Sequence, residues 1–174
     1  MSLQTSREEY IKALKMGQRE ADELVSAGKD PNPQVLDELL PDIDTLTVVD
    51  VGVLEIPAER IIGTKSAGRI AAFSPSFLPL LDPKTEFAGK WISLCDAHLG
   101  TEGIRDPITC YEYLGNFYVQ EGNKRVSVLR YFGAPRIPAS VKRVMPPMSD
   151  DPRIVAYYEF VDFFKSAGIY LSLI

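Results

Sequence analysis

At residues 117–130 the chain reads Phe117-Tyr118-Val119-Gln120-Glu121-Gly122-Asn123-Lys124-Arg125-Val126-Ser127-Val128-Leu129-Arg130. The first residues have high strand propensity, and a partner strand precedes them across the turn Leu114-Gly115-Asn116. After Gly122 the apolar residues follow the spacing of a helix face, which ends at Gly133. The stretch therefore predicts a strand, a glycine and a helix in that order.

Two cations, Lys124 and Arg125, stand in the first turn of that predicted helix. The first turn of a helix leaves backbone N–H groups unpaired and carries the positive end of the helix dipole, so acidic side chains are preferred there. A bound anion would resolve the conflict, because it could accept from the free N–H groups and pair with both charges. We therefore expect an anion at this helix start. The alternative is that both side chains are simply solvated.

The composition restricts the classes of protein to which the chain can belong. Its 174 residues suffice for one sizeable core, and the net charge of −5 argues against general nucleic-acid binding while leaving room for a local basic patch. A single histidine excludes a multi-histidine metal site. There is no apolar run of membrane-spanning length and no signal-peptide pattern, so we expect a cytoplasmic protein without membrane contacts. Cys95 and Cys110 are then expected to be reduced core residues.

Two amphipathic helices are predicted within residues 1–44. Thr5 or Ser6 would cap the first helix, which Gly28 would end, and the second would begin near Pro33. Their apolar sides are Tyr10, Leu14, Ala21, Leu24 and Val25 in the first, and Val35, Leu36, Leu39 and Leu40 in the second. We expect these residues to form an N-terminal arm that covers the core or makes a contact in a homodimer.

A strand is predicted from Thr45 to Leu54, and a polar loop from Gly63 to Arg69. The loop has glycines five apart, as a phosphate-binding P-loop does, but Arg69 replaces the lysine and Ile70 replaces the hydroxyl residue that would contact magnesium. A P-loop is therefore not expected. The remaining alternatives are a basic loop that closes over a ligand and a plain surface turn.

The second half of the chain is predicted to alternate helices and strands. The residues Phe87, Trp91, Leu94, Cys95 and His98 fall on one face of a helix. Cys95 and His98 lack the third ligand that a catalytic zinc needs, so we expect core packing. A strand follows from Ile137 to Val144. Residues 147–174 are expected to form a helix rich in aromatic residues, ending at Gly168, and an apolar strand at 169–174. We expect that strand to lead into a longer parent chain; the alternative is that it pairs with a partner.

The order of these elements resembles the ParB/sulfiredoxin N-terminal domain superfamily. The resemblance covers residues 48–144 and is carried by Gly103-Ile104-Arg105-Asp106-Pro107-Ile108, by Tyr118-Val119-Gln120-Glu121-Gly122-Asn123-Lys124-Arg125, and by Gly133 followed by Ile137-Pro138-Ala139. It implies an α+β fold in which a ParB/sulfiredoxin-like mixed sheet, within a domain at residues 45–146, is flanked by helices.

In that superfamily the Gly-x-x-Arg helix start binds phosphates. ParB proteins use it for cytidine triphosphate with magnesium, sulfiredoxins for ATP, and related members for kinase chemistry. The positions to which the resemblance assigns ligand binding are Gly122, Asn123, Lys124, Arg125, Arg69, Ile104 and Ile108. The implied ligand is a nucleoside triphosphate with magnesium, or another phosphate-bearing small molecule.

The chain departs from the superfamily at Asn123. Sulfiredoxins need a nucleophilic cysteine there, so sulfiredoxin activity is not expected. ParB-type sites have an acidic residue at this position, although the side-chain oxygen of Asn123 or the carboxylate of Glu121 could still contact magnesium. Glu121 and Asp106 are the weak candidates for a catalytic carboxylate. Since no helix-turn-helix follows, DNA recognition by this chain has little support.

Three interpretations follow, and the first is the one we favour. The chain is a module that binds a phosphate-bearing ligand at the Gly122 helix start, with a nucleotide as the favoured ligand. Alternatively it is a small enzyme of phosphoryl transfer or nucleotide hydrolysis, in which Lys124 and Arg125 stabilise transition-state charge. The third interpretation is a protein- or DNA-interaction domain that has lost nucleotide binding.

Overall fold

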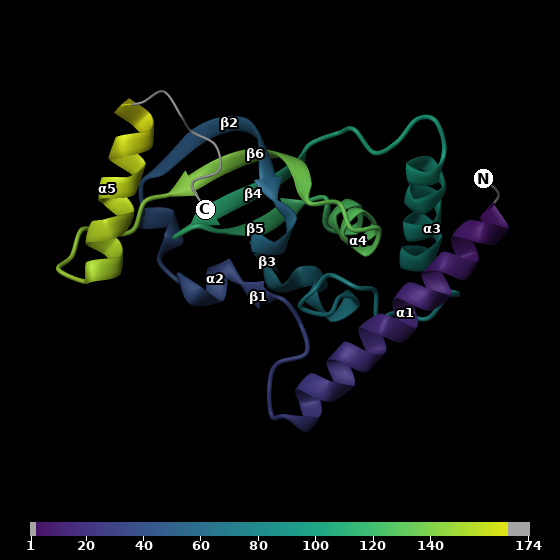
Figure 1. Cartoon of the computed structure of the whole chain (residues 1–174). Helices are drawn as coiled ribbons and strands as arrows, with labels where there is room; N and C mark the ends of the chain where they lie inside the picture. Colours follow the sequence, from purple (N-terminus) through teal and green to yellow (C-terminus); the bar gives the residue numbers. More distant parts are fainter. Residues whose placement is uncertain (1–2, 167–174) are drawn as a thin grey trace.

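A computed structural model of the chain describes residues 3–166 (Figure 1). Its helices are α1 (Leu3–Ser26), α2 (Leu36–Leu39), α3 (Glu86–Leu99), α4 (Asn123–Tyr131) and α5 (Pro152–Ser166), with 3-10 turns η1 (Ile43–Thr45), η2 (Ala58–Arg60) and η3 (Ala67–Ala72). Its strands are β1 (Gln34–Val35), β2 (Val48–Pro57), β3 (Ile61–Thr64), β4 (Ile108–Tyr113), β5 (Asn116–Glu121) and β6 (Arg136–Val144). The fold is therefore α+β.

The six strands form one mixed sheet in the order β1-β3-β5-β4-β6-β2. The pairs β1–β3, β3–β5 and β4–β6 are parallel, whereas β4–β5 and β2–β6 are antiparallel. The predicted hairpin is confirmed: β4 and β5 pair across Leu114 and Gly115, which both have a positive φ. The predicted mixed sheet flanked by helices is confirmed at this level of detail.

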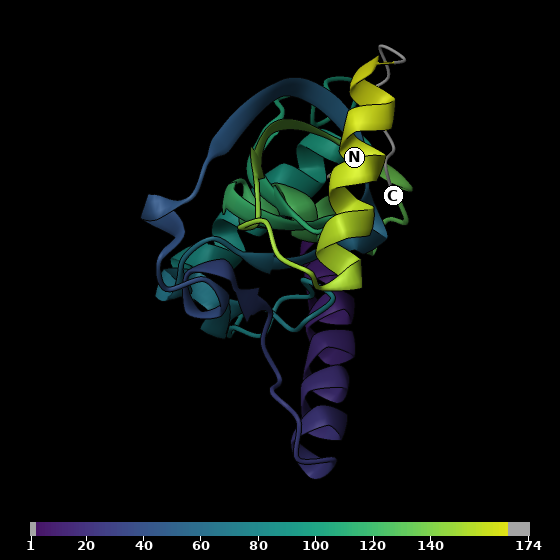
Figure 2. The same cartoon turned by 90° about the vertical axis from the view of Figure 1, so that its left-hand side faces the viewer.

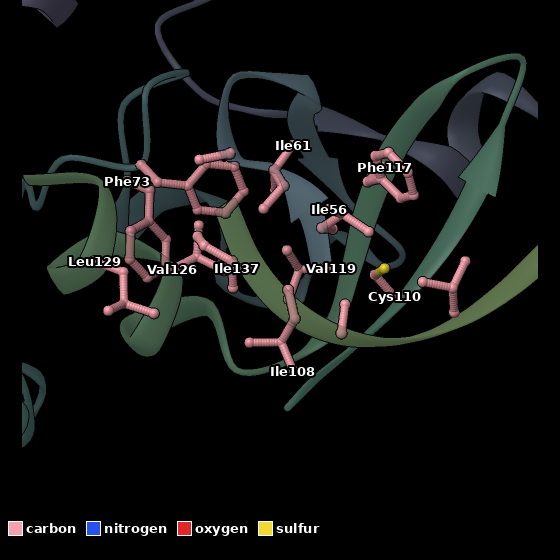
Figure 3. Close-up of a cluster of buried hydrophobic side chains, with 14 of the residues drawn as sticks. Ile56, Ile61, Phe73, Ile108, Cys110, Phe117, Val119, Val126, Leu129 and Ile137 are labelled. Atoms are coloured by element: carbon pink, nitrogen blue, oxygen red, sulfur yellow. The ribbon is translucent and has the colours of Figure 1, made fainter. Parts of the chain in front are cut away.

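Side chains alternate between the two faces of the sheet, and both faces are covered. On one face, residues such as Ile108, Val119 and Ile137 pack with Val126 from α4, as Figure 3 shows. Phe73 and Phe77 join the same cluster, so the apolar connection at residues 73–81 packs against the sheet. On the opposite face, residues of β4, β5 and β6 meet α2 and η1 in a cluster of Leu36, Ile43, Tyr118 and Val144.

A further cluster joins α1, α3 and α4. Tyr10 from α1 and Trp91 from α3 are fully buried, with ring centroids 5.2 Å apart, and Val128 reaches them from α4. Cys95 belongs to this cluster, so the predicted core face of α3 is confirmed; Cys95 and Cys110 are both buried and unbridged.

The N-terminal region differs from the prediction. Helix α1 begins at Leu3, so Ser6 lies inside it, fully buried, instead of capping it. The prediction of a helix beginning near Pro33 was wrong for its first residues, because Gln34 and Val35 form strand β1 and pair with Gly63 and Thr64 of β3. Only four residues of helix, α2, follow. Leu39, expected in the core, is 51 % exposed.

The boundaries of other elements also differ from those predicted from the sequence. The C-terminal half of α1 extends beyond the rest of the chain (Figure 2), which explains why Val25 is 61 % exposed instead of buried. The first long strand runs from Val48 to Pro57, later than predicted, and Gly63 and Thr64 belong to β3 instead of a loop.

The strand at residues 136–144 and the start of α5 at Pro152 agree with the prediction. The predicted helix end at Gly168 and the strand at 169–174 lie outside the described residues. Within residues 3–166, no helix combines the length and the apolar character that crossing a membrane requires.

Candidate functional site

A pocket of about 840 Å³ opens where the end of β5 meets the start of α4, with α3 and η3 as its other walls. Its lining residues come from four parts of the chain and are Arg69, Phe73, Glu86, Phe87, Gly89, Lys90, Ser93, Leu94, Gln120, Glu121, Gly122, Asn123, Lys124 and Arg125. Arg69 and residues 121–125, which the sequence assigned to one site, therefore do share one pocket.

Gly122 forms the junction between β5 and α4, with a φ of 108°. A Cβ at this position would lie 2.7 Å from Ile108 Cγ2, so the close approach of β4 as well as the backbone conformation requires glycine. The carbonyl of Gly122 accepts the first helical hydrogen bond, from Val126 N at 3.0 Å, and no side chain caps the helix. The N–H groups of the first turn have no acceptor within the helix and lie at the positive end of its dipole.

Arg125 ties the start of α4 to the turn that precedes β4. Its Nη1 donates to the carbonyl oxygens of Asp106 and Pro107, each at 3.0 Å. Asp106 thus contributes its backbone to this region, and its exposed carboxylate is not part of the pocket lining. The turn at Pro107 and the start of α4 therefore lie together, joined by the side chain of Arg125 through two backbone carbonyls.

Four cationic side chains line the pocket, against the two carboxylates of Glu86 and Glu121. Lys90 forms an ion pair with Glu86 at 3.0 Å, and this contact lowers the pKa of the Glu86 carboxyl. Lys124 Nζ lies 5.6 Å from the centroid of the Phe87 ring. Burial, and then the charges of Arg69 and Lys90, lower the pKa of Lys124 below its ordinary value. An anion in the pocket would relieve this repulsion.

Asn123 presents a polar atom without a partner. Its Oδ1 is buried and accepts no hydrogen bond from the described residues, a state that costs free energy unless a ligand or ion compensates. A side-chain carbonyl oxygen is a suitable magnesium ligand, as is the carboxylate of Glu121, which lines the same pocket. Among residues 3–166, no three His, Cys, Asp or Glu side chains gather where they could hold a metal ion without such help.

Two predicted site residues do not line the pocket. Ile108 is 1 % exposed and lies beneath Gly122 in the sheet cluster. Ile104 packs between that cluster and the one joining α1, α3 and α4. Both lie behind the pocket wall and support the site through packing.

Sequence reasoning missed the contribution of α3. Glu86, Lys90 and Ser93 recur at helical spacing on the side of α3 opposite its buried residues, and all three line the pocket. That spacing is the one available signal, but it marks a polar helix face without revealing what the face meets.

No protein-family model, no curated protein and no solved structure matches the chain. Its function is therefore inferred from the chemistry of the pocket.

Proposed function

We propose that this pocket binds a phosphate-bearing ligand and that the ligand is a nucleotide. One observation carries the proposal: four cationic side chains and the uncapped start of α4 face the same pocket. The chain as a whole has a net charge of −5, whereas the pocket has two more cations than carboxylates. Backbone N–H groups at a helix start, together with lysine and arginine, are the ordinary means of holding phosphate.

The size and the apolar wall of the pocket favour a nucleotide over a bare phosphate ion. Its volume of about 840 Å³ lies within the range of roughly 300–1,000 Å³ of small-molecule sites. Phe87 and Leu94 supply apolar surface beside the cations, and a base or sugar could pack there while the phosphates occupy the start of α4. Arg69 would contact the phosphates from the wall formed by η3.

We also propose that the domain is a divergent ParB/sulfiredoxin-like fold. The hairpin β4–β5, the Gly122 junction and the helix α4 follow one another as that resemblance implies, and Arg125 joins the Pro107 turn to the helix start. If magnesium accompanies the nucleotide, Asn123 Oδ1 and Glu121 are the oxygens that would hold it, and the ion would neutralise phosphate charge.

Thermal unfolding tests the proposal. A ligand at a hundredfold its Kd adds about 2.7 kcal/mol to the free energy of unfolding, which is about 5–10 °C for a chain of this size. We expect such a rise with at least one of the triphosphates of adenosine, cytidine, guanosine and uridine in the presence of magnesium. Arg69→Gln should reduce the rise, because it removes one of the cations proposed to contact the phosphates. Since Arg69 is exposed, this substitution should leave the packing of the protein intact.

The matched control is Lys15→Gln, which removes one positive charge from the exposed side of α1, away from the pocket. It should leave the response to nucleotide unchanged. Absence of any rise with nucleotides, inorganic phosphate or sulfate would overturn the proposal.

A further inference from the structure

The guanidinium of Arg125 is held between two parts of the backbone. Its Nη1 donates to the carbonyl oxygens of Asp106 and Pro107, each at 3.0 Å. A Cβ at Gly122 would lie 3.2 Å from Arg125 Nη2, which places the other end of the group beside the junction of β5 and α4. A guanidinium that is bonded at one end and packed at the other has little freedom to rotate.

The turn that holds Arg125 is shaped by its proline. The ring of Pro107 fixes its own φ, and the proline also restricts Asp106 to extended conformations. The local sequence therefore sets the directions of the two carbonyl groups that meet Nη1. Both residues are exposed, and neither lines the pocket. A change in the turn can reach a ligand only through the groups that the turn holds.

Arg125 keeps donors that the turn does not use. A guanidinium has five N–H donors in one plane, and the two on Nη1 are directed at the turn. Among residues 3–166, no acceptor takes a hydrogen bond from Nε or Nη2, and the side chain lines the pocket. Nε and Nη2 each carry an N–H on the same edge of the group, and two oxygens of one phosphate match that edge.

We propose that the Asp106–Pro107 turn is a positioning element for the ligand, because it holds Arg125 so that Nε and Nη2 receive two oxygens of one phosphate group. The inference rests on the proposed function and adds how the site recognises phosphate. Since the fork is oriented before the ligand arrives, less side-chain freedom is lost on binding. Pro107 is then a positioning residue, which acts on the ligand through Arg125.

Binding of inorganic pyrophosphate to the full chain, measured by isothermal titration calorimetry, tests the role of the fork. Arg125→Lys keeps the charge but removes the planar fork, so it should weaken binding by about tenfold or more, as the loss of a hydrogen bond to a charged group does. Arg69→Lys is the matched comparison, since Arg69 lines the same pocket and makes no hydrogen bond to the described residues. It should weaken binding by about threefold or less.

Pro107→Ala tests the turn itself. It keeps both carbonyls but frees the backbone that aims them, so it should weaken pyrophosphate binding about threefold or more, the cost of ordering one side chain. In the Arg125→Lys protein the same substitution should change the affinity by less than about twofold, because an ammonium has no fork to orient. Pro152→Ala is the control: Pro152 also follows an aspartate, is exposed and lies outside the pocket. It should leave the affinity unchanged.

The outcomes separate this inference from the proposed function. A purely structural role of Pro107 would weaken binding equally with Arg125 or lysine at position 125, and that result would overturn the inference. Full affinity in Pro107→Ala, or a loss in Arg125→Lys no greater than that in Arg69→Lys, would overturn it as well. In each case the wild type still binds pyrophosphate and the proposed function stands. A wild type that does not bind pyrophosphate would remove the inference, while the response to nucleotides decides the proposed function.

Discussion

At Gly122 the backbone conformation and the packing both exclude a side chain. The φ of 108° is one that residues with a Cβ rarely adopt, and a Cβ would lie 2.7 Å and 3.0 Å from two atoms of Ile108. We expect Gly122→Ala to lower the free energy of unfolding by about 2–6 kcal/mol, since backbone strain and overpacking each cost about 1–3 kcal/mol. Chemical denaturation measures the change.

Gly89→Ala provides the matched control. Gly89 is exposed on α3 and lines the same pocket, but a Cβ there would meet nothing within 4 Å. This substitution should raise the free energy of unfolding by up to about 1 kcal/mol, because alanine favours a helix over glycine. A Gly122→Ala protein as stable as the wild type would show that the junction does not depend on glycine.

The role of Arg125 could be predicted from the sequence only in part. A cation in the first turn of a helix indicated an anion site, and the residue does line the pocket. The sequence could not reveal that Nη1 also donates to the carbonyls of Asp106 and Pro107, because those partners lie on a different element. Arg125 therefore has a structural role beside the proposed one, and Arg69 is the cleaner position for testing ligand binding.

Among the elements, α5 is attached to the sheet through a buried polar group. Tyr157 donates its hydroxyl to the carboxylate of Glu112 on β4, with 2.8 Å between the hydroxyl and Oε1, and Arg143 Nε on β6 lies 3.6 Å from the same oxygen. Glu112 is 1 % exposed. Burial raises the pKa of its carboxyl above the ordinary value, although Tyr157 and Arg143 act in the opposite direction.

Burial of the Glu112 carboxyl makes the free energy of unfolding depend on pH. Because the pKa of Glu112 is higher in the folded than in the unfolded chain, the folded chain binds this proton more tightly. The resulting stabilisation is complete below the unfolded value of about 4.3 and is lost as the pH rises through the folded pKa. The free energy of unfolding of the wild type, minus that of Glu112→Gln, should therefore fall as the pH rises from about 4 towards neutrality.

Denaturation at a series of pH values measures this difference, and Glu102→Gln, which changes an exposed carboxyl in a loop, is the control. A difference between wild type and Glu112→Gln that stays constant, or rises, over the same pH range would contradict the shift of the Glu112 pKa.

Local signals were enough for some elements and insufficient for others. The hairpin and the Gly122 junction follow from strand propensity, turn residues and helix spacing within a short stretch. Strand β1 has only two residues, and it exists because Gln34 and Val35 pair with β3. The one local clue lay in Gly63, where a Cβ would approach Gln34 O to 2.3 Å. A glycine within a strand often marks such a close backbone approach.

At the scale of the whole molecule, the pocket depends on how α1, α3 and α4 pack together. Trp91 Nε1 on α3 donates to Ser127 Oγ on α4 at 2.9 Å, and Tyr10 of α1 packs against the Trp91 ring. This packing sets which face of α3 meets the pocket, and therefore places Lys90 there. Hydrophobic spacing predicted the buried face of α3, but the partner of the polar face arises only from tertiary structure.

The same packing bears on the expectation that residues 1–44 form an arm. Tyr10 is 0 % exposed and its hydroxyl donates to Leu81 O at 2.6 Å, whereas Val25, on the same helix, is 61 % exposed. We expect Tyr10→Ala to lower the free energy of unfolding by about 3–5 kcal/mol, as for other buried aromatic residues, and Val25→Ala to change it by less than about 0.5 kcal/mol. Chemical denaturation followed by Trp91 fluorescence measures both. If Tyr10→Ala were as mild as Val25→Ala, α1 would be a dispensable arm; the expected loss would instead make α1 part of the core that positions α3, and with it the pocket.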